Sequence, residues 1–134
     1  MPYILLVEDN QSNADYAIRV LSAAGYQVKH VLRGLEAPPM ARQERPSLIL
    51  MDFDLPDIDG RTMILLLRKQ LEGITPQPPI VALTARTSAM DQRIAARLGC
   101  AAFVGKPFTP DILVNIVQTL LKTKQPSAES PPPS

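Results

Sequence analysis

The segment LILMD at residues 48–52 places an unbroken run of apolar residues directly before an aspartate. An apolar run of this length predicts a strand that is buried on both faces, as in a parallel sheet. The acidic segment 53–60 that follows contains proline and glycine and is typical of a loop. Asp52 is therefore expected at the carboxyl end of a buried strand, where α/β folds place their ligands. Considered alone, such an aspartate is more often a residue that caps a turn.

The rest of the chain alternates between short apolar runs and segments whose apolar residues recur at helical spacing. The apolar runs predict strands at residues 3–7, 27–31, 48–52, 80–84 and 101–104. The other segments predict helices at residues 10–24, 38–45, 61–71, 90–98 and 109–121. Because a helical connection makes consecutive strands parallel, this order predicts an α/β fold, a doubly wound sheet of five parallel strands with right-handed crossovers.

Particular residues set the predicted helix boundaries. Proline is tolerated only in the first turn of a helix, so Pro38-Pro39 predicts a short second helix that starts at about Pro38. Glycine commonly follows the last residue of a helix, so Gly25 and Gly99 are expected to end the first and fourth helices. The third helix contains the apolar run 63–67 and is expected to be mostly buried.

Composition favours a single globular domain. The chain has 134 residues, is 46% hydrophobic and carries a net charge of +1, which indicates neither a nucleic-acid surface nor a membrane surface. A single cysteine excludes an internal disulfide, and no apolar run approaches the ~20 residues of a membrane span. We expect a cytoplasmic protein with one domain at residues 1–123 and a disordered Pro- and Ser-rich tail at 124–134.

Four of the five predicted strands end in a chemically reactive side chain. If the strands are ordered 2-1-3-4-5, the third strand is central and the carboxyl ends of all strands meet at one edge. The residues expected to converge there are Glu8, Asp9, Asp52, Thr84 and Lys106. Each has a plainer explanation alone: the acids as helix or turn caps, the threonine as a strand end and the lysine as a surface residue.

Three carboxylates in one crevice repel one another, and without a counter-charge at least one should have a raised pKa. A divalent cation removes that cost, and oxygen ligands favour a hard ion such as magnesium. We therefore predict a Mg²⁺ site at Glu8, Asp9 and Asp52. The lone His30, expected at the surface of a strand edge, and the lone Cys100, expected in the core, offer no nitrogen–sulfur alternative.

A carboxylate beside magnesium, a lysine and a hydroxyl meets the needs of phosphoryl transfer, in which negative charge must be neutralised while the nucleophile is held in line. In this arrangement Asp52 is the nucleophile and forms an aspartyl phosphate. Lys106 supplies positive charge to the phosphoryl oxygens, and Thr84 donates a hydrogen bond to one of them.

The sequence contains five short motifs: LLVEDN at 5–10, LILMD at 48–52, LPDIDG at 55–60, ALTA at 82–85 and KPF at 106–108. With these motifs the sequence resembles response-regulator receiver domains, the CheY-like family. Each motif is weak alone, but all five occur in order, each near the end of a predicted strand. The resemblance covers about residues 3–121 and implies the flavodoxin-like strand order 2-1-3-4-5.

The resemblance implies a role for each residue of the acidic cluster. Asp52 is the phosphoacceptor, which receives a phosphoryl group from a histidine kinase or a phosphotransfer protein. Glu8 and Asp9 hold Mg²⁺ together with Asp52 and the backbone carbonyl of Asp54.

The resemblance also implies a switch. Thr84 and Phe103 match the residues that move on phosphorylation, and the Lys106–Pro107 peptide bond is expected to be cis. The surface that changes is expected at residues 90–121, where an output partner binds. The chain is then a monomeric or weakly dimeric signalling switch that catalyses only its own phosphorylation and dephosphorylation.

Two residues beside the predicted site are hypothesised to set the lifetime of the phosphoryl group. Asp54 and Arg86 each lie two residues beyond a site residue, Asp52 and Thr84 respectively. From there they can flank the path of an attacking water molecule.

Two other classes of protein share part of this pattern. A haloacid-dehalogenase-like phosphatase also has an Asp-x-Asp motif after a buried strand, as at residues 52–54. Its acidic metal motif, however, follows the lysine in the chain, whereas Glu8-Asp9 precedes Lys106. The second alternative is a pseudo-receiver that binds partners without being phosphorylated, although every expected site residue is present.

Overall fold

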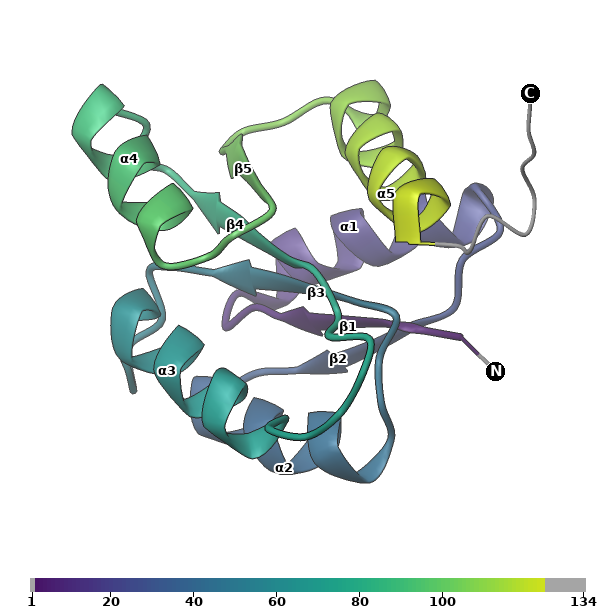
Figure 1. Cartoon of the computed structure of the whole chain (residues 1–134). Coiled ribbons are helices and arrows are strands. Elements are labelled where there is room, and N and C mark those ends of the chain that lie inside the picture. The colour runs from purple at the N-terminus through teal and green to yellow at the C-terminus, as the bar shows by residue number, and fades with distance from the viewer. Residues whose placement is uncertain (1, 125–134) are drawn as a thin grey trace, which may run out of the picture.

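The computed structural model describes residues 2–124 and forms one parallel sheet with helices on both faces (Figure 1). The strand order is β2-β1-β3-β4-β5, and every neighbouring pair is parallel, which confirms the predicted fold. The strands are β1 Ile4–Val7, β2 Val28–Val31, β3 Leu48–Asp52, β4 Ile80–Thr84 and β5 Ala102–Gly105. The helices are α1 Gln11–Ala23, α2 Ala37–Gln43, α3 Gly60–Gln70, α4 Ala89–Arg97 and α5 Pro110–Lys124, with a 3-10 helix at Gly34–Glu36.

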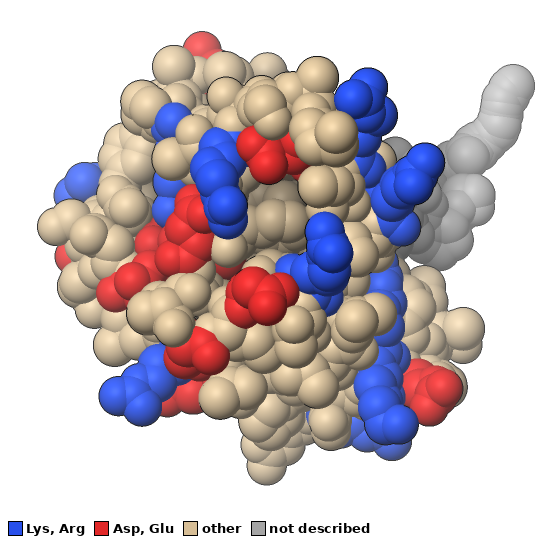
Figure 2. Space-filling model, turned by 90° about the vertical axis from the view of Figure 1, so that its left-hand side faces the viewer, with Lys and Arg blue, Asp and Glu red and all other residues tan. Residues whose placement is uncertain are grey.

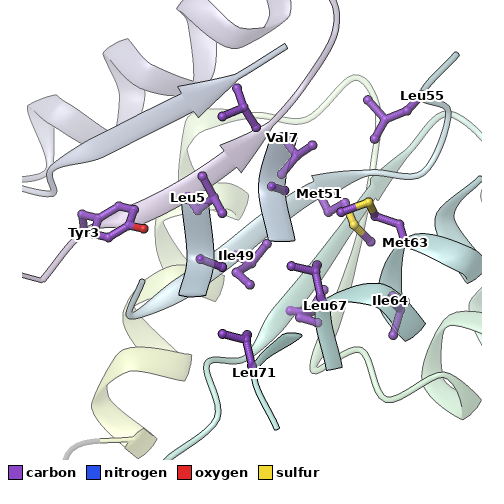
Figure 3. Close-up of a cluster of buried hydrophobic side chains, with 14 of the residues drawn as sticks. Tyr3, Leu5, Val7, Ile49, Met51, Leu55, Met63, Ile64, Leu67 and Leu71 are labelled. Atoms are coloured by element: carbon purple, nitrogen blue, oxygen red, sulfur yellow. The ribbon is translucent and has the colours of Figure 1, made fainter. Parts of the chain in front are cut away.

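Two core layers lie on opposite faces of the sheet, because successive side chains of a strand point to opposite sides. Leu5 and Ile49 pack against α2 and α3 in the layer that Figure 3 shows. Leu6 and Leu50, their neighbours in sequence, pack against α1 and α5 in the other layer. Both faces of the central strands are therefore covered, which explains why their sequences are apolar without alternation.

The helix boundaries follow the predicted signals. The side chain of Asn10 caps α1 by accepting a hydrogen bond of 2.9 Å from the N–H of Asn13. Gly25 and Gly99 each have a φ of 95° just beyond the ends of α1 and α4, a conformation that favours glycine. The helix α2 carries its two prolines in its first turn, so the prediction of a short helix that starts at about Pro38 is confirmed within one residue.

The helix α3 is amphipathic, so the prediction that it is mostly buried is wrong. Met63, Ile64 and Leu67 are buried against the sheet, whereas 61% of Leu65 and 37% of Leu66 are exposed. A helix on the outer face of a sheet covers the core with one stripe only, even when its sequence is apolar on more than one side.

The final helix runs to Lys124, one residue into the segment predicted as a tail. Residues 125–134 of that predicted tail lie outside the described part of the chain, so the domain boundary stays a prediction. Within residues 2–124, no helix combines the length and the apolar character needed to cross a membrane.

Candidate functional site

The register of the sheet brings the predicted site residues to one edge. In the pairing of β1 with β3, the residue that follows β1 stands beside the last residue of β3, so Glu8 neighbours Asp52. In the pairing of β4 with β5, Thr84 lies opposite Gly105, so Lys106 follows directly beside it. The predicted convergence of these strand ends is therefore observed.

Burial singles out three of these side chains. Glu8, Asp52 and Thr84 are each only 2% exposed, and they are the buried polar or charged residues among those that the structure describes. Burying a polar or charged group costs free energy unless it is paired. All three occur at one edge of the sheet, which indicates a site whose chemistry requires them.

Lys106 pairs with two of the buried acids. Its Nζ donates hydrogen bonds to Glu8 Oε1 at 2.8 Å and to Asp52 Oδ2 at 3.0 Å. Burial lowers the pKa of Lys106, but these contacts with Glu8 and Asp52 raise it more, so the pKa lies above its usual value. The lysine therefore stays charged. The peptide bond to Pro107 is cis, as the resemblance implied.

One lysine does not fully compensate the carboxylates. Burial and the neighbouring Asp52 raise the pKa of Glu8, and the contacts with Lys106 lower it only in part. The predicted raised pKa in the cluster is thus found at Glu8. Glu8, Asp9 and Asp52 each offer an oxygen, and these oxygens lie within 4.8 Å of one another. Such an all-oxygen set fits a hard divalent cation such as Mg²⁺.

The carboxylate of Asp54 makes contacts that the sequence did not predict. Thr84 Oγ1 donates to Asp54 Oδ2 at 3.1 Å. On the other side, Arg86 Nε and Nη2 lie 3.2 and 3.1 Å from Asp54 Oδ1. Asp54 and Arg86, the two residues expected to set the phosphoryl lifetime, therefore contact each other, and both contact the predicted switch residue Thr84.

Phe103 lies beside the same network. It is half-buried on β5 and lines a cleft of about 370 Å³ together with Thr84, Arg86, Ile94 and Leu98. The two predicted switch residues therefore share one cleft. Figure 2 views the molecule from the carboxyl ends of the strands and shows acidic side chains interspersed with Lys and Arg there.

Two residues near the site have contacts that local patterns did not indicate. His30 lies on the edge strand β2, as expected, but its side chain is half-buried and its Nε2 lies 2.7 Å from the backbone carbonyl oxygen of Glu8. Asp57 lies in the acidic segment 53–60 that is predicted to be a loop, and its carboxylate accepts hydrogen bonds from the N–H groups of Gly34 at 3.1 Å and Leu35 at 3.0 Å. It thereby ties the loop after β3 to the loop after β2.

Replacing Asp57 with alanine is expected to lower the free energy of unfolding by about 0.5 kcal/mol at pH 7, because the bonds lie on an exposed loop. Desolvation raises the pKa of Asp57, but the N–H groups of Leu35 and Gly34 lower it more, so the net pKa is depressed. The stabilisation is therefore present above the ordinary pKa and is lost as pH falls through the folded-state value. Urea unfolding of the wild type and of Asp57→Ala at pH 7 and pH 3 measures this contribution. A difference in the free energy of unfolding that is as large at pH 3 as at pH 7 would contradict the prediction.

A doubly wound parallel sheet with a buried aspartate that pairs with a lysine at its carboxyl edge is the arrangement of CheY-like receiver domains. The family model "Response regulator receiver domain" matches residues 4–118, and the chain belongs to this family. The transcriptional regulatory protein CreB of Escherichia coli K12 is 36% identical over 129 residues, which cover 96% of this chain and 55% of CreB. The polar-differentiation response regulator DivK of Brucella anthropi is 31% identical over 118 residues, 88% of this chain and 94% of DivK.

A solved structure supports the same assignment. The receiver domain of the sensor histidine kinase PA1611 from Pseudomonas aeruginosa is 35% identical, with a TM-score of 0.80, and the match covers 90% of this chain and 98% of that one. That structure has a magnesium ion coordinated in its active site cleft. The chain spans about half the length of CreB, but nearly the whole length of DivK.

Because it belongs to this family, the chain is a receiver domain of two-component signalling. This family assignment takes precedence over the haloacid-dehalogenase-like phosphatase as an interpretation of the Asp-x-Asp motif. Receiver domains are signalling switches and not enzymes in the usual sense. Receiver domains of this type interact with histidine kinases and with output domains.

Proposed function

We propose that Asp52 accepts a phosphoryl group from a histidine kinase or a phosphotransfer protein. The observation that carries the proposal is a carboxylate that is 2% exposed at the end of the central strand, with Lys106 Nζ 3.0 Å from its Oδ2. An oxygen of Asp52 attacks the phosphorus as the bond to the donor's histidine nitrogen breaks, and Lys106 neutralises charge on the transferred group. Hydrolysis of the aspartyl phosphate returns the receiver to its starting state.

Mg²⁺ fits the same site. Glu8, Asp9 and Asp52 would hold the ion together with the backbone carbonyl of Asp54. When bound, the ion supplies positive charge against the phosphoryl oxygens. The proposal is supported by the clustered carboxylate oxygens and by the magnesium ion in the similar receiver domain of PA1611.

Phosphorylation is proposed to act through Thr84 and Phe103 on a surface at residues 90–121. Thr84 donates its hydroxyl to the phosphoryl group, and Phe103 moves further into the core. On this surface Met90 and Ile112 are large apolar residues that are 57% and 48% exposed and can contact a partner. The partner is proposed to be a protein in the cytoplasm, neither nucleic acid nor membrane, and the receiver a monomer or weak homodimer.

Incubation with Mg²⁺ and acetyl phosphate tests the proposed function. Intact-mass spectrometry is expected to show the addition of one phosphoryl group, and the NMR signal of Phe103 is expected to shift. A protein that binds Mg²⁺ but gains no mass, from acetyl phosphate or from a histidine-phosphorylated phosphotransfer protein, would support the pseudo-receiver alternative instead.

The double variant Asp54→Ala with Arg86→Ala is expected to lose its phosphoryl group roughly threefold faster, because removing both side chains opens the path of an attacking water molecule. The rate can be followed by intact mass after acetyl phosphate is removed. The control is Asp15→Ala with Arg19→Ala, which removes the same charges from exposed positions of α1. An unchanged rate in the site variant would contradict the lifetime role of Asp54 and Arg86.

A further inference from the structure

The hydrogen of the Thr84 hydroxyl group is already used in a hydrogen bond within the protein. It donates to Asp54 Oδ2 at 3.1 Å, and its oxygen accepts a hydrogen bond of 3.0 Å from the N–H of Arg86. A hydroxyl has one hydrogen to donate. While that hydrogen is directed to Asp54, Thr84 has none to offer a group on Asp52.

The Asp54 carboxylate is held in place by its own partners. Oδ1 faces the guanidinium group of Arg86, with contacts of 3.2 and 3.1 Å, while Oδ2 also accepts from the N–H of Ala85 at 3.3 Å. Asp54, Thr84 and Arg86 thus form a closed ring of hydrogen bonds. The ring joins Asp54 in the loop after β3 to Thr84 at the end of β4 and to Arg86 in the loop after β4.

The other proposed phosphoryl ligand, Lys106, is bound to Glu8 and to Asp52 itself. Because one of its partners is the proposed acceptor, it is in place before any phosphoryl group arrives. Thr84 is buried, at 2% exposure, and its hydroxyl has a different acceptor.

We propose that Asp54 is a positioning residue whose carboxylate competes with the phosphoryl group for the hydroxyl of Thr84. This inference rests on the proposed function, in which Asp52 is the phosphoacceptor and Thr84 the hydroxyl donor. Switching then exchanges one acceptor for another, and the strength of the Asp54 contact sets how much of the phosphoryl group's binding free energy remains to stabilise the active state.

The strength of this competition is limited by solvent. The side chains of Asp54 and Arg86 are 35% and 68% exposed, and ion pairs at such exposure are weak and screened by salt. A single hydrogen bond of this kind corresponds to about a fivefold change in an equilibrium constant. The contact can therefore restrain Thr84 and still yield to a phosphoryl group.

The test measures affinity for beryllofluoride, an anion of phosphoryl shape, at saturating Mg²⁺. The variant Asp54→Ala is expected to bind it about fivefold more tightly than the wild type, as followed by the NMR signals of the Ala85 and Arg86 amides. Without beryllofluoride, those two amide signals should already be displaced in the variant, because the N–H of Ala85 donates to Asp54 and the N–H of Arg86 donates to the hydroxyl of Thr84 that Asp54 holds.

Removing a negative charge near an anion also tightens binding, so the decisive measurement is a double-mutant cycle with Thr84→Val. If Asp54 acts by competing for the hydroxyl, the gain from Asp54→Ala falls to less than about twofold in the Thr84→Val background. An equal gain in both backgrounds would overturn the proposal, because it would show that charge alone is responsible. Asp15→Ala, which removes an exposed carboxylate from α1, is the control for net charge.

Different results would contradict the proposed function and the role of Asp54. If wild-type protein binds Mg²⁺ but neither beryllofluoride nor a phosphoryl group, the proposed function fails. If the wild type binds beryllofluoride and Asp54→Ala binds it no more tightly, the proposed function stands and the role of Asp54 is overturned.

Discussion

In the presence of Mg²⁺ and acetyl phosphate, the fraction of Asp52→Asn protein that carries a phosphoryl group is expected to be at least about a hundredfold lower than that of the wild type. The amide has no anionic oxygen to attack phosphorus. Glu8, the other buried carboxylate of the site, has a pKa that burial raises, and its Oε1 accepts a hydrogen bond from Lys106. It is therefore a poor substitute nucleophile. Intact-mass spectrometry of both proteins after the same incubation measures the effect.

A matched substitution separates the role of Asp52 from a general loss of charge. Asp15→Asn makes the same chemical change at an exposed position of α1 and should leave phosphorylation as in the wild type. Asp52→Asn also removes a negative neighbour that raises the pKa of Glu8, so the variant should stay folded, as circular dichroism can check. If Asp52→Asn is phosphorylated to the wild-type extent, the acceptor is another residue and the proposed site is wrong.

Replacing Leu50 with alanine is expected to lower the free energy of unfolding by about 3 kcal/mol. Leu50 lies in the central strand β3, has no exposed surface and packs in the layer covered by α1 and α5. The substitution removes buried apolar atoms and leaves a cavity between rigid elements that cannot close around it. Urea unfolding followed by circular dichroism suits this protein, which contains no tryptophan.

The control for this prediction is Leu65→Ala on α3. The chemical change is identical, but 61% of Leu65 is exposed, so the free energy of unfolding should change by less than about 0.5 kcal/mol. Similar losses in the two variants would show that burial in the β3 layer does not dominate the stability of this fold.

Much of the fold could be predicted because the central strands are buried on both faces. That burial makes their sequences continuous apolar runs, and the polar residues that follow mark where each strand ends, as at Asp52 and Thr84. In a parallel sheet those ends share one edge, so the order of elements places Glu8, Asp52, Thr84 and Lys106 at that edge, and the strand order 2-1-3-4-5 brings them together. Only the exact strand order needed the resemblance to a known family.

Local periodicity was a poor guide where a side chain's surroundings depend on its neighbours in space. The apolar run in α3 predicts burial, but only one stripe of the helix meets the sheet, which leaves Leu65 and Leu66 exposed. His30 belongs to an edge strand, yet its ring reaches the carbonyl of Glu8. In both cases the outcome depends on which elements pack nearby, and this information is not contained in the local pattern.

The sequence by itself determined which residues end the strands, and hence which chemical groups are available at the site. Only the tertiary structure decided how those groups pair. Lys106 contacts both Glu8 and Asp52, and the Thr84 hydroxyl is directed to Asp54. The physical reason is that hydrogen bonds are short and directional, so their partners depend on how loops that are distant in sequence are placed by the packing of the whole sheet.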